Sequence, residues 1–197
     1  MIPAGVILYG PPGSGKDTIT TELSRIRPEF TLFQRLKAGP GRTAGYRPTT
    51  AAHIEELAQA GELLYRNTRY GAEYAIDRAE VVTLISDGRI PVLHMGQVAG
   101  VSAIGAFPVP IRWVKVLLWC PYEVTEERCR SRGDQDLDAR LKVWDETRQD
   151  LLDHSNKPWS LAIRTDHVSA KQAAQAIDEA RSASVDTEEC DIRGLVG

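Results

Sequence analysis

Short apolar runs alternate along this sequence with longer segments that carry apolar residues at helical spacing. The runs at 4–9, 30–33, 90–94, 113–120 and 159–164 are typical of strands buried on both faces of a parallel sheet. Helical spacing or capping residues mark the segments 16–26, 49–60, 76–86, 122–131, 138–152 and 169–180. This alternation predicts an α/β fold, a parallel sheet flanked by helices.

Three stretches depart from the alternation. Residues 62–75 are rich in aromatic side chains and roughly alternating, which predicts a short antiparallel pair beside the main sheet. Residues 38–48 are rich in Gly and Pro, and together with residues 34–37, which lead into them, they predict a loop. Residues 182–197 show no periodicity and predict a loose tail. The length of the remaining chain suits a single domain over 1–181.

Composition narrows the function classes. The 197 residues are 42% hydrophobic and carry a net charge of -3, which argues against broad binding of nucleic acid or an anionic membrane. The apolar N-terminus lacks a basic region, and no run is long enough to span a bilayer. Cys120, Cys129 and Cys190 lack metal-binding spacing and indicate reduced thiols. We therefore expect a cytoplasmic protein.

The most specific motif follows the first predicted strand directly. Residues 10–18 read GPPGSGKDT, which fits the phosphate-loop spacing G-x-x-x-x-G-K between a strand and a helix. A plain Gly-Pro turn would not combine this context with a lysine at this offset. The motif predicts an ATP-binding loop formed by Gly10, Gly13, Ser14, Gly15, Lys16, Asp17 and Thr18.

Asp17 stands where such loops usually have the Ser or Thr whose hydroxyl contacts Mg²⁺. Its carboxylate is a candidate metal ligand, or it holds a metal-bound water while Thr18 binds a phosphate. A third interpretation is an acidic residue favoured at a helix N-terminus by the helix dipole.

Candidate acceptor-binding residues follow two other predicted strands. Arg35 and Lys37 follow the second strand, and such cations suit a phosphate. His94 and Gln97 lie at the carboxyl end of the strand at 90–94, where α/β sheets bind ligands. A structural role for His94 is the alternative.

A basic segment separates the helices predicted at 122–131 and 138–152. Arg128, Arg130, Arg132 and Arg140 surround Gly133 and several acidic residues. This pattern predicts a mobile lid, near 132–138, whose arginines reach transferring phosphates. The alternative is a solvated helix pair held by ion pairs one turn apart.

Taken together, these residues resemble the guanylate kinase branch of the P-loop nucleoside monophosphate kinases over roughly residues 4–180. The resemblance is carried by the phosphate loop and, in the same order as in the family, by the segment IEELAQAGELL at 54–64, Tyr74, the run RSRG at 130–133 and ARL at 139–141. It implies a P-loop kinase fold with a small acceptor-binding subdomain near 35–75 and a lid.

The resemblance also implies an activity: Mg²⁺-dependent phosphoryl transfer from ATP to a phosphorylated small molecule. By matching positions, Tyr46 and Tyr74 would bond the acceptor phosphate and Arg35 and Lys37 would supply charge. Lys16, Arg132 and Arg140 would act on the transferring group. The oligomeric state stays open, a homodimer included.

Departures from the family concern the acceptor. Tyr65 stands where guanylate kinases read guanine with a Glu, Ile76 replaces a Ser or Thr, and His94 replaces an Asp. A pocket without those carboxylates loses the hydrogen bonds to guanine, which indicates a nucleotide with an unusual base. The Gly-Lys-Asp at 15–17 resembles the phosphate loop of the ribose 1,5-bisphosphate kinases. This resemblance implies a second class of acceptor, a phosphorylated sugar.

Two other classes fit less well. A non-catalytic guanylate-kinase-like scaffold, which binds proteins, would lack a working phosphate loop, whereas Lys16 is present. A GTPase would carry D-x-x-G and N-K-x-D motifs, but Asn156-Lys157 continues as Pro158-Trp159.

Overall fold

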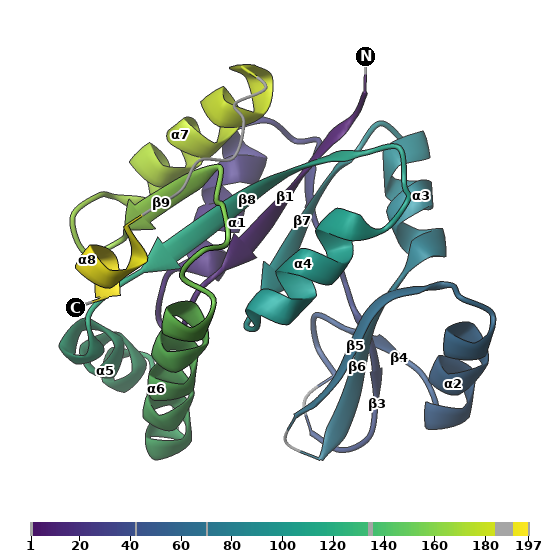
Figure 1. Ribbon diagram of the computed structural model, residues 1–197, viewed down its shortest axis with the longest axis horizontal. Helices are drawn as coiled ribbons and strands as arrows, with labels where there is room; N and C mark the ends of the chain where they lie inside the picture. The colour runs from purple at the N-terminus through teal and green to yellow at the C-terminus, as the bar shows by residue number, and fades with distance from the viewer. Residues whose placement is uncertain (1, 42, 70, 134–135, 184–190, 197) are drawn as a thin grey trace.

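The central feature of the computed structural model is a five-stranded parallel sheet (Figure 1). The structure describes residues 2–41, 43–69, 71–133, 136–183 and 191–196. The sheet contains β1 (Ala4–Tyr9), β2 (Phe30–Leu32), β7 (Ile90–Met95), β8 (Arg112–Trp119) and β9 (Leu161–Arg164), in the order β2-β7-β1-β8-β9. Because β1 is central, the loop that follows it leaves the middle of the sheet's carboxyl edge.

Helices cover both faces of this sheet (Figure 1). One face packs against α1 (Lys16–Ile26) and α7 (Ala170–Ala183). The other packs against α3 (Arg78–Ser86), α4 (Val98–Ala106), α6 (Leu137–Asp153) and α8 (Ile192–Val196), while α5 (Tyr122–Ser131) lies beside α6. Successive residues of β1 supply the two faces, because Val6 and Leu8 belong to the first core and Ile7 and Tyr9 to the second.

A second, smaller sheet stands apart from the first (Figure 1). It contains β3 (Leu36–Ala38), β4 (Arg47–Pro48), β5 (Leu63–Arg69) and β6 (Ala72–Asp77), in the order β4-β3-β6-β5, and packs against α2 (Ala51–Gln59). The antiparallel pair expected over 62–75 is confirmed by β5 and β6. The loop expected over 34–48 is corrected, because β3 and β4 lie within it; strands of two or three residues leave no periodic pattern.

Two helix boundaries differ from the expectation. The helix expected from residue 76 begins at Arg78, because the Asp77 carboxylate caps it by accepting from the Glu80 backbone N–H at 3.2 Å. Helix α4 had no sequence signal, since its apolar residues do not confine themselves to one face. Its Gly100 permits close packing, and a Cβ there would lie 2.9 Å from the Tyr65 ring.

The C-terminal segment is packed where a loose tail was expected. Ile192 and Val196 of α8 are buried against the core beside α6. The Arg148 side chain also donates to the Val196 carbonyl oxygen, at 2.9 Å. A helix of five residues is too short to show periodicity, which explains the error; residues 184–190 and 197 lie outside the described part.

Helix α6 is anchored to the sheet through Asp150. The Asp150 carboxylate accepts from the Tyr9 hydroxyl at 2.9 Å and from the Val98 backbone N–H, at the start of α4, at 2.7 Å. Burial raises the pKa of Tyr9 far above its ordinary value, and the Asp150 charge raises it further. The hydroxyl therefore stays protonated and keeps donating to Asp150.

Cys120 and Cys129 are buried, and Cys190 lies outside the described residues. Within the described ranges, no helix combines the length and the apolarity needed to cross a bilayer.

Candidate functional site

The phosphate loop connects β1 to α1 and is shaped by its glycines. A Cβ on Gly10 would clash with the Leu118 carbonyl oxygen of the neighbouring strand. Gly15 has a φ of 86° and forms the N-cap of α1, a left-handed conformation that favours glycine. The loop therefore wraps closely around the start of α1, where free backbone N–H groups favour an anion.

Lys16 lies inside this loop. Its Nζ donates to the carbonyl oxygens of Gly10 and Pro11, at 2.7 and 2.8 Å, and to the Ser14 hydroxyl at 3.2 Å. Burial lowers the pKa of Lys16 to about 8, and the nearby Arg132 cation also lowers it, against the opposing effect of Asp17. An anion bound beside Nζ would favour the charged form.

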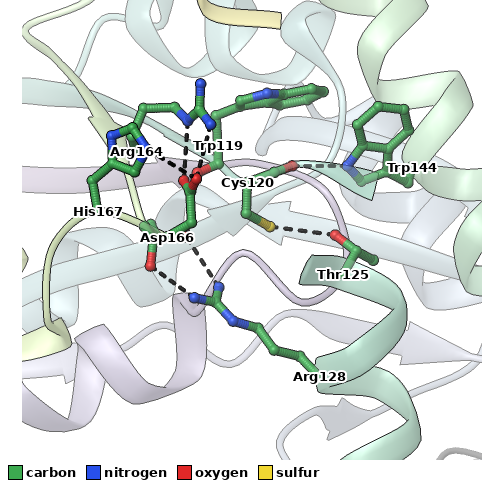
Figure 2. A network of polar contacts seen from close by, with 9 residues as sticks. Trp119, Cys120, Thr125, Arg128, Trp144, Arg164, Asp166 and His167 are labelled. Atoms are coloured by element: carbon green, nitrogen blue, oxygen red, sulfur yellow. Dashed lines mark hydrogen bonds and ion pairs between the residues drawn. The ribbon is translucent and has the colours of Figure 1, made fainter. Parts of the chain in front are cut away.

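Side chains of α5 contact the loop and hold it in place. Figure 2 shows one of them, Arg128, reaching the segment after β9. Arg128 donates to the Gly13 carbonyl oxygen at 2.9 Å and to the Thr165 carbonyl oxygen at 2.7 Å. Thr125 donates to the Pro12 carbonyl oxygen at 3.2 Å. Arg128 was expected in the lid, but these contacts assign it to bracing the loop.

A cavity of about 300 Å³ opens from the phosphate loop. The predicted ATP-binding residues Gly10, Gly13, Ser14, Gly15, Lys16, Asp17 and Thr18 line it, together with Arg35, Tyr46, Tyr65, Tyr74, His94, Gln97, Arg132 and Arg140. Lys37 lines an adjoining cavity that also contains Arg35, Tyr46 and Tyr74. The structure thus brings the predicted residues together around two adjoining cavities.

Two tyrosines and two cations form a cluster at the small-sheet side of the cavity, which we call the tyrosine cluster. The rings of Tyr46 and Tyr74 lie 5.3 Å apart between centroids. The Arg35 guanidinium carbon lies 5.8 Å from the Tyr46 centroid and 5.2 Å from the Tyr74 centroid, and Lys37 Nζ lies 5.9 Å from each. This arrangement orients two cations and two hydroxyl-bearing rings in one place.

The wall beyond this cluster is polar. Tyr65 donates to the Gln97 amide oxygen at 2.6 Å, and burial raises the pKa of the Tyr65 hydroxyl. Asn67 and Arg69 also line the wall, although the sequence analysis missed both. Their alternate positions along β5 were the available signal, since side chains two residues apart share a face.

Asn67 and Arg69 differ in how their polar atoms are satisfied. The Asn67 Oδ1 atom is buried without a hydrogen-bond partner among the described residues. Arg69 instead pairs with Glu146 of α6 at 3.5 Å. The pair connects the small sheet to α6 across the cavity wall.

Two arginines reach the cavity from α5 and α6. Arg132, the residue after α5, is exposed and contacts the Cys129 sulfur at 3.5 Å. Arg140 of α6 pairs with Asp136 at 2.8 Å. Residues 134 and 135 of the expected lid lie outside the described residues, and Arg130 forms a surface pair with Glu126 rather than entering the cavity.

His94, at the end of β7, contacts both the first helix and Asp17. Its Nε2 lies 2.8 Å from the Thr20 hydroxyl oxygen, and its Nδ1 lies 3.6 Å from Asp17 Oδ1. Burial lowers the pKa of His94 to about 4, and the Lys16 and Arg35 cations also lower it, against the effect of Asp17. The imidazole is therefore neutral near pH 7.

The donor set fits a hard divalent cation that arrives with phosphates. Among the described residues that line the first cavity, Asp17 is the single acid, and its side chain is 86% exposed. No cluster of three His, Cys, Asp or Glu residues occurs in the described ranges. Mg²⁺ commonly binds through one or two carboxylates plus substrate phosphates, which agrees with this arrangement.

No family model and no curated protein sequence matches this chain. Among solved structures, the guanylate kinase from Anaplasma phagocytophilum is similar, with a TM-score of 0.65 and 15% sequence identity. The match covers 93% of this chain and 87% of that chain. At this identity the likeness establishes the architecture alone: the parallel sheet, its flanking helices and the loop after β1 form a P-loop kinase fold.

Proposed function

We propose that this protein is an ATP-dependent phosphotransferase that transfers the γ-phosphate to a phosphorylated small molecule, a nucleoside monophosphate in the first instance. One observation carries the proposal. Lys16 of the phosphate loop and Arg35 of the tyrosine cluster line the same cavity from different sides. Two phosphates held in this way would meet inside the cavity, which is the geometry that phosphoryl transfer between phosphates requires.

The protein would act mainly by positioning and by charge. Lys16 and the loop N–H groups would hold the β- and γ-phosphates, while Arg132 and Arg140 would stabilise charge on the transferring group. An oxygen of the acceptor phosphate would attack the γ-phosphorus, and the bond between the γ-phosphorus and the bridging oxygen would break, so that ADP leaves. Mg²⁺ held by Asp17 would neutralise charge on the phosphates.

A second cavity beside the loop would accommodate the nucleoside of ATP. A cavity of about 720 Å³ is lined by Gly15, Thr18, Arg132, Thr165 and Asp166, among others. Thr18 and Arg132 line both this cavity and the first one. A nucleotide could therefore place its base here and its phosphates over Lys16.

The residues at the acceptor end of the first cavity do not suit a guanine base. Tyr65 and Gln97 are bonded to each other, and the described wall there lacks a carboxylate to accept from the guanine N1–H and amino group. A nucleotide with a different base agrees better with these polar groups. Arg69, a cation at the same wall, favours a second candidate acceptor, ribose 1,5-bisphosphate, whose second phosphate it would bind.

The experiment is an assay of ADP formation from ATP with Mg²⁺ and a panel of acceptors: GMP, dGMP, AMP, CMP, UMP, dTMP and ribose 1,5-bisphosphate. A reaction without acceptor measures hydrolysis, and product analysis identifies the phosphorylated compound. We expect one acceptor to raise ADP formation well above hydrolysis. ATP turnover that ignores every acceptor, or a protein that does not bind ATP, would contradict the proposal.

A further inference from the structure

The hydrogen bonds around Thr20 determine which nitrogen of His94 carries a proton. The Thr20 hydroxyl donates its single hydrogen to the Lys16 carbonyl oxygen at 2.8 Å. At the 2.8 Å contact with His94, the Thr20 oxygen can therefore act only as an acceptor. It follows that His94 Nε2 carries a hydrogen and donates it to Thr20, and Nδ1 is the ring nitrogen available to a ligand.

Nδ1 faces the carboxylate of Asp17 at 3.6 Å. Two ligand atoms bound to one ion at about 2.1 Å lie roughly 3.0–3.5 Å apart. The two side chains therefore need only a small adjustment to share an ion. The Nε2–H contact completes the pattern, since a metal-binding His usually donates its other N–H to an oxygen that fixes the ring.

We propose that His94 Nδ1 and the Asp17 carboxylate together bind a first-row transition-metal ion, with Mn²⁺ as the probe, at the mouth of the phosphate loop. An imidazole ligand favours such ions over Mg²⁺, which prefers oxygen alone. The inference rests on the proposed function in one respect, because the phosphates of a bound substrate complete the coordination.

The surrounding charges make the phosphates necessary. Lys16 and Arg35 are close enough to act electrostatically on His94, and two cations oppose a bare metal ion. A polyphosphate over Lys16 reverses the local charge. We therefore expect strong Mn²⁺ binding with a polyphosphate and weak binding without it.

The test is pulsed electron paramagnetic resonance of Mn²⁺ bound to the full chain with tripolyphosphate, which contains no nitrogen. We expect a nitrogen hyperfine coupling from the His94 ring. His94→Gln keeps an N–H donor for Thr20 but lacks the ring nitrogen, so the coupling should disappear and Mn²⁺ affinity should fall at least about tenfold. Asp17→Asn should lower the affinity while the coupling remains.

The chain offers a matched control on α2. His53 Nδ1 lies 3.5 Å from a Glu56 carboxylate oxygen, an exposed pair of the same chemistry and spacing. His53→Gln should leave the coupling and the affinity unchanged. A coupling that survives His94→Gln, or that disappears with His53→Gln, would overturn the inference, as would Mn²⁺ bound without nitrogen coupling.

The acceptor assay separates this inference from the proposed function. Phosphoryl transfer without nitrogen coupling would retain the function and reject His94 as a ligand. A nitrogen coupling lost in His94→Gln, in a protein that transfers no phosphate, would retain the metal site and reject the kinase.

Discussion

The two ends of the first cavity are constructed differently. At one end, Lys16 belongs to a loop of consecutive residues and is bonded to that loop's own carbonyl oxygens. At the other end, Arg35, Tyr46 and Tyr74 come from three segments of the small sheet and meet through ring contacts. The first end is a local structure that α5 braces, whereas the second depends on how separate strands pair.

Because of this difference, substitutions at the two ends should affect different kinetic constants. A change at the loop should affect every acceptor alike, because the loop would hold the phosphates of ATP. A change in the tyrosine cluster should affect the acceptor and spare ATP. Substitutions at each end can therefore break or sharpen the contrast.

The largest effect is expected for Lys16→Ala. Loss of this cation should lower kcat/KM for ATP roughly 10³-fold or more, because it removes charge stabilisation of the transferring group. The coupled assay measures the loss, and thermal unfolding checks the fold. Lys171→Ala, on an exposed position of α7, is the control and should behave as the parent. A Lys16 variant with near-normal turnover would refute the assignment of the loop.

Arg35→Met should raise KM for the acceptor roughly 10- to 100-fold and leave KM for ATP unchanged. A hydrogen bond to a charged group contributes about 1.5–3 kcal/mol, which corresponds to such a change. Steady-state kinetics with each substrate varied in turn provides the test. Arg25→Met removes an exposed arginine of α1 and serves as control. An equal rise in both KM values would erase the contrast between the two ends.

Arg128→Met tests the brace behind the loop. It leaves the carbonyl oxygens of Gly13 and Thr165 without this donor, which should cost about 1–3 kcal/mol of unfolding free energy and lower Tm by several degrees. KM for ATP should rise up to about tenfold. Arg130→Met removes a surface ion pair on the same helix and should change stability by less than about 0.5 kcal/mol. Equal melting temperatures for both variants would contradict the brace.

Tyr65→Phe should have the smallest effect. It removes the hydrogen bond to Gln97, worth about 1 kcal/mol, and should raise KM for the acceptor a few-fold at constant KM for ATP. Because burial raises the pKa of Tyr65, its hydroxyl keeps its proton through neutral pH, so the difference between variant and parent should be constant from pH 6 to 9. A difference that varies across this range would argue against that bond.

The same contrast explains how much could be predicted from the sequence. The loop and α1 were predictable because spacing, glycines and capping act over adjacent residues. For Asn67 and Arg69 the spacing indicated only that they share a face of β5 with Tyr65, and which face meets the cavity depends on how the small sheet sits against the rest of the molecule. Arg128 was assigned to the lid because the sequence shows its charge. The sequence does not show that its partners are the carbonyl oxygens of Gly13 and Thr165.

The sequence was also uninformative for two helices whose apolar pattern is weak. Helix α4 has apolar or small residues on every side, although only part of it is buried, so these residues form no single stripe. Helix α8 is too short for a pattern and is held by the Arg148 contact. In both cases tertiary contacts determine the structure.

The Asp150 contact sets the distance between the core and the cavity end of α6. Asp150 ties the helix to Tyr9 and Val98, whereas Arg140 lies ten residues toward its other end, about 15 Å along the axis at 1.5 Å per residue. Trp144, between these two residues, is buried and donates to the Cys120 carbonyl oxygen at 3.0 Å, so the helix is held to the core along this length. The length of α6 therefore fixes where Arg140 meets the cavity, and a helix one turn shorter or longer would move that guanidinium by about 5 Å along the axis.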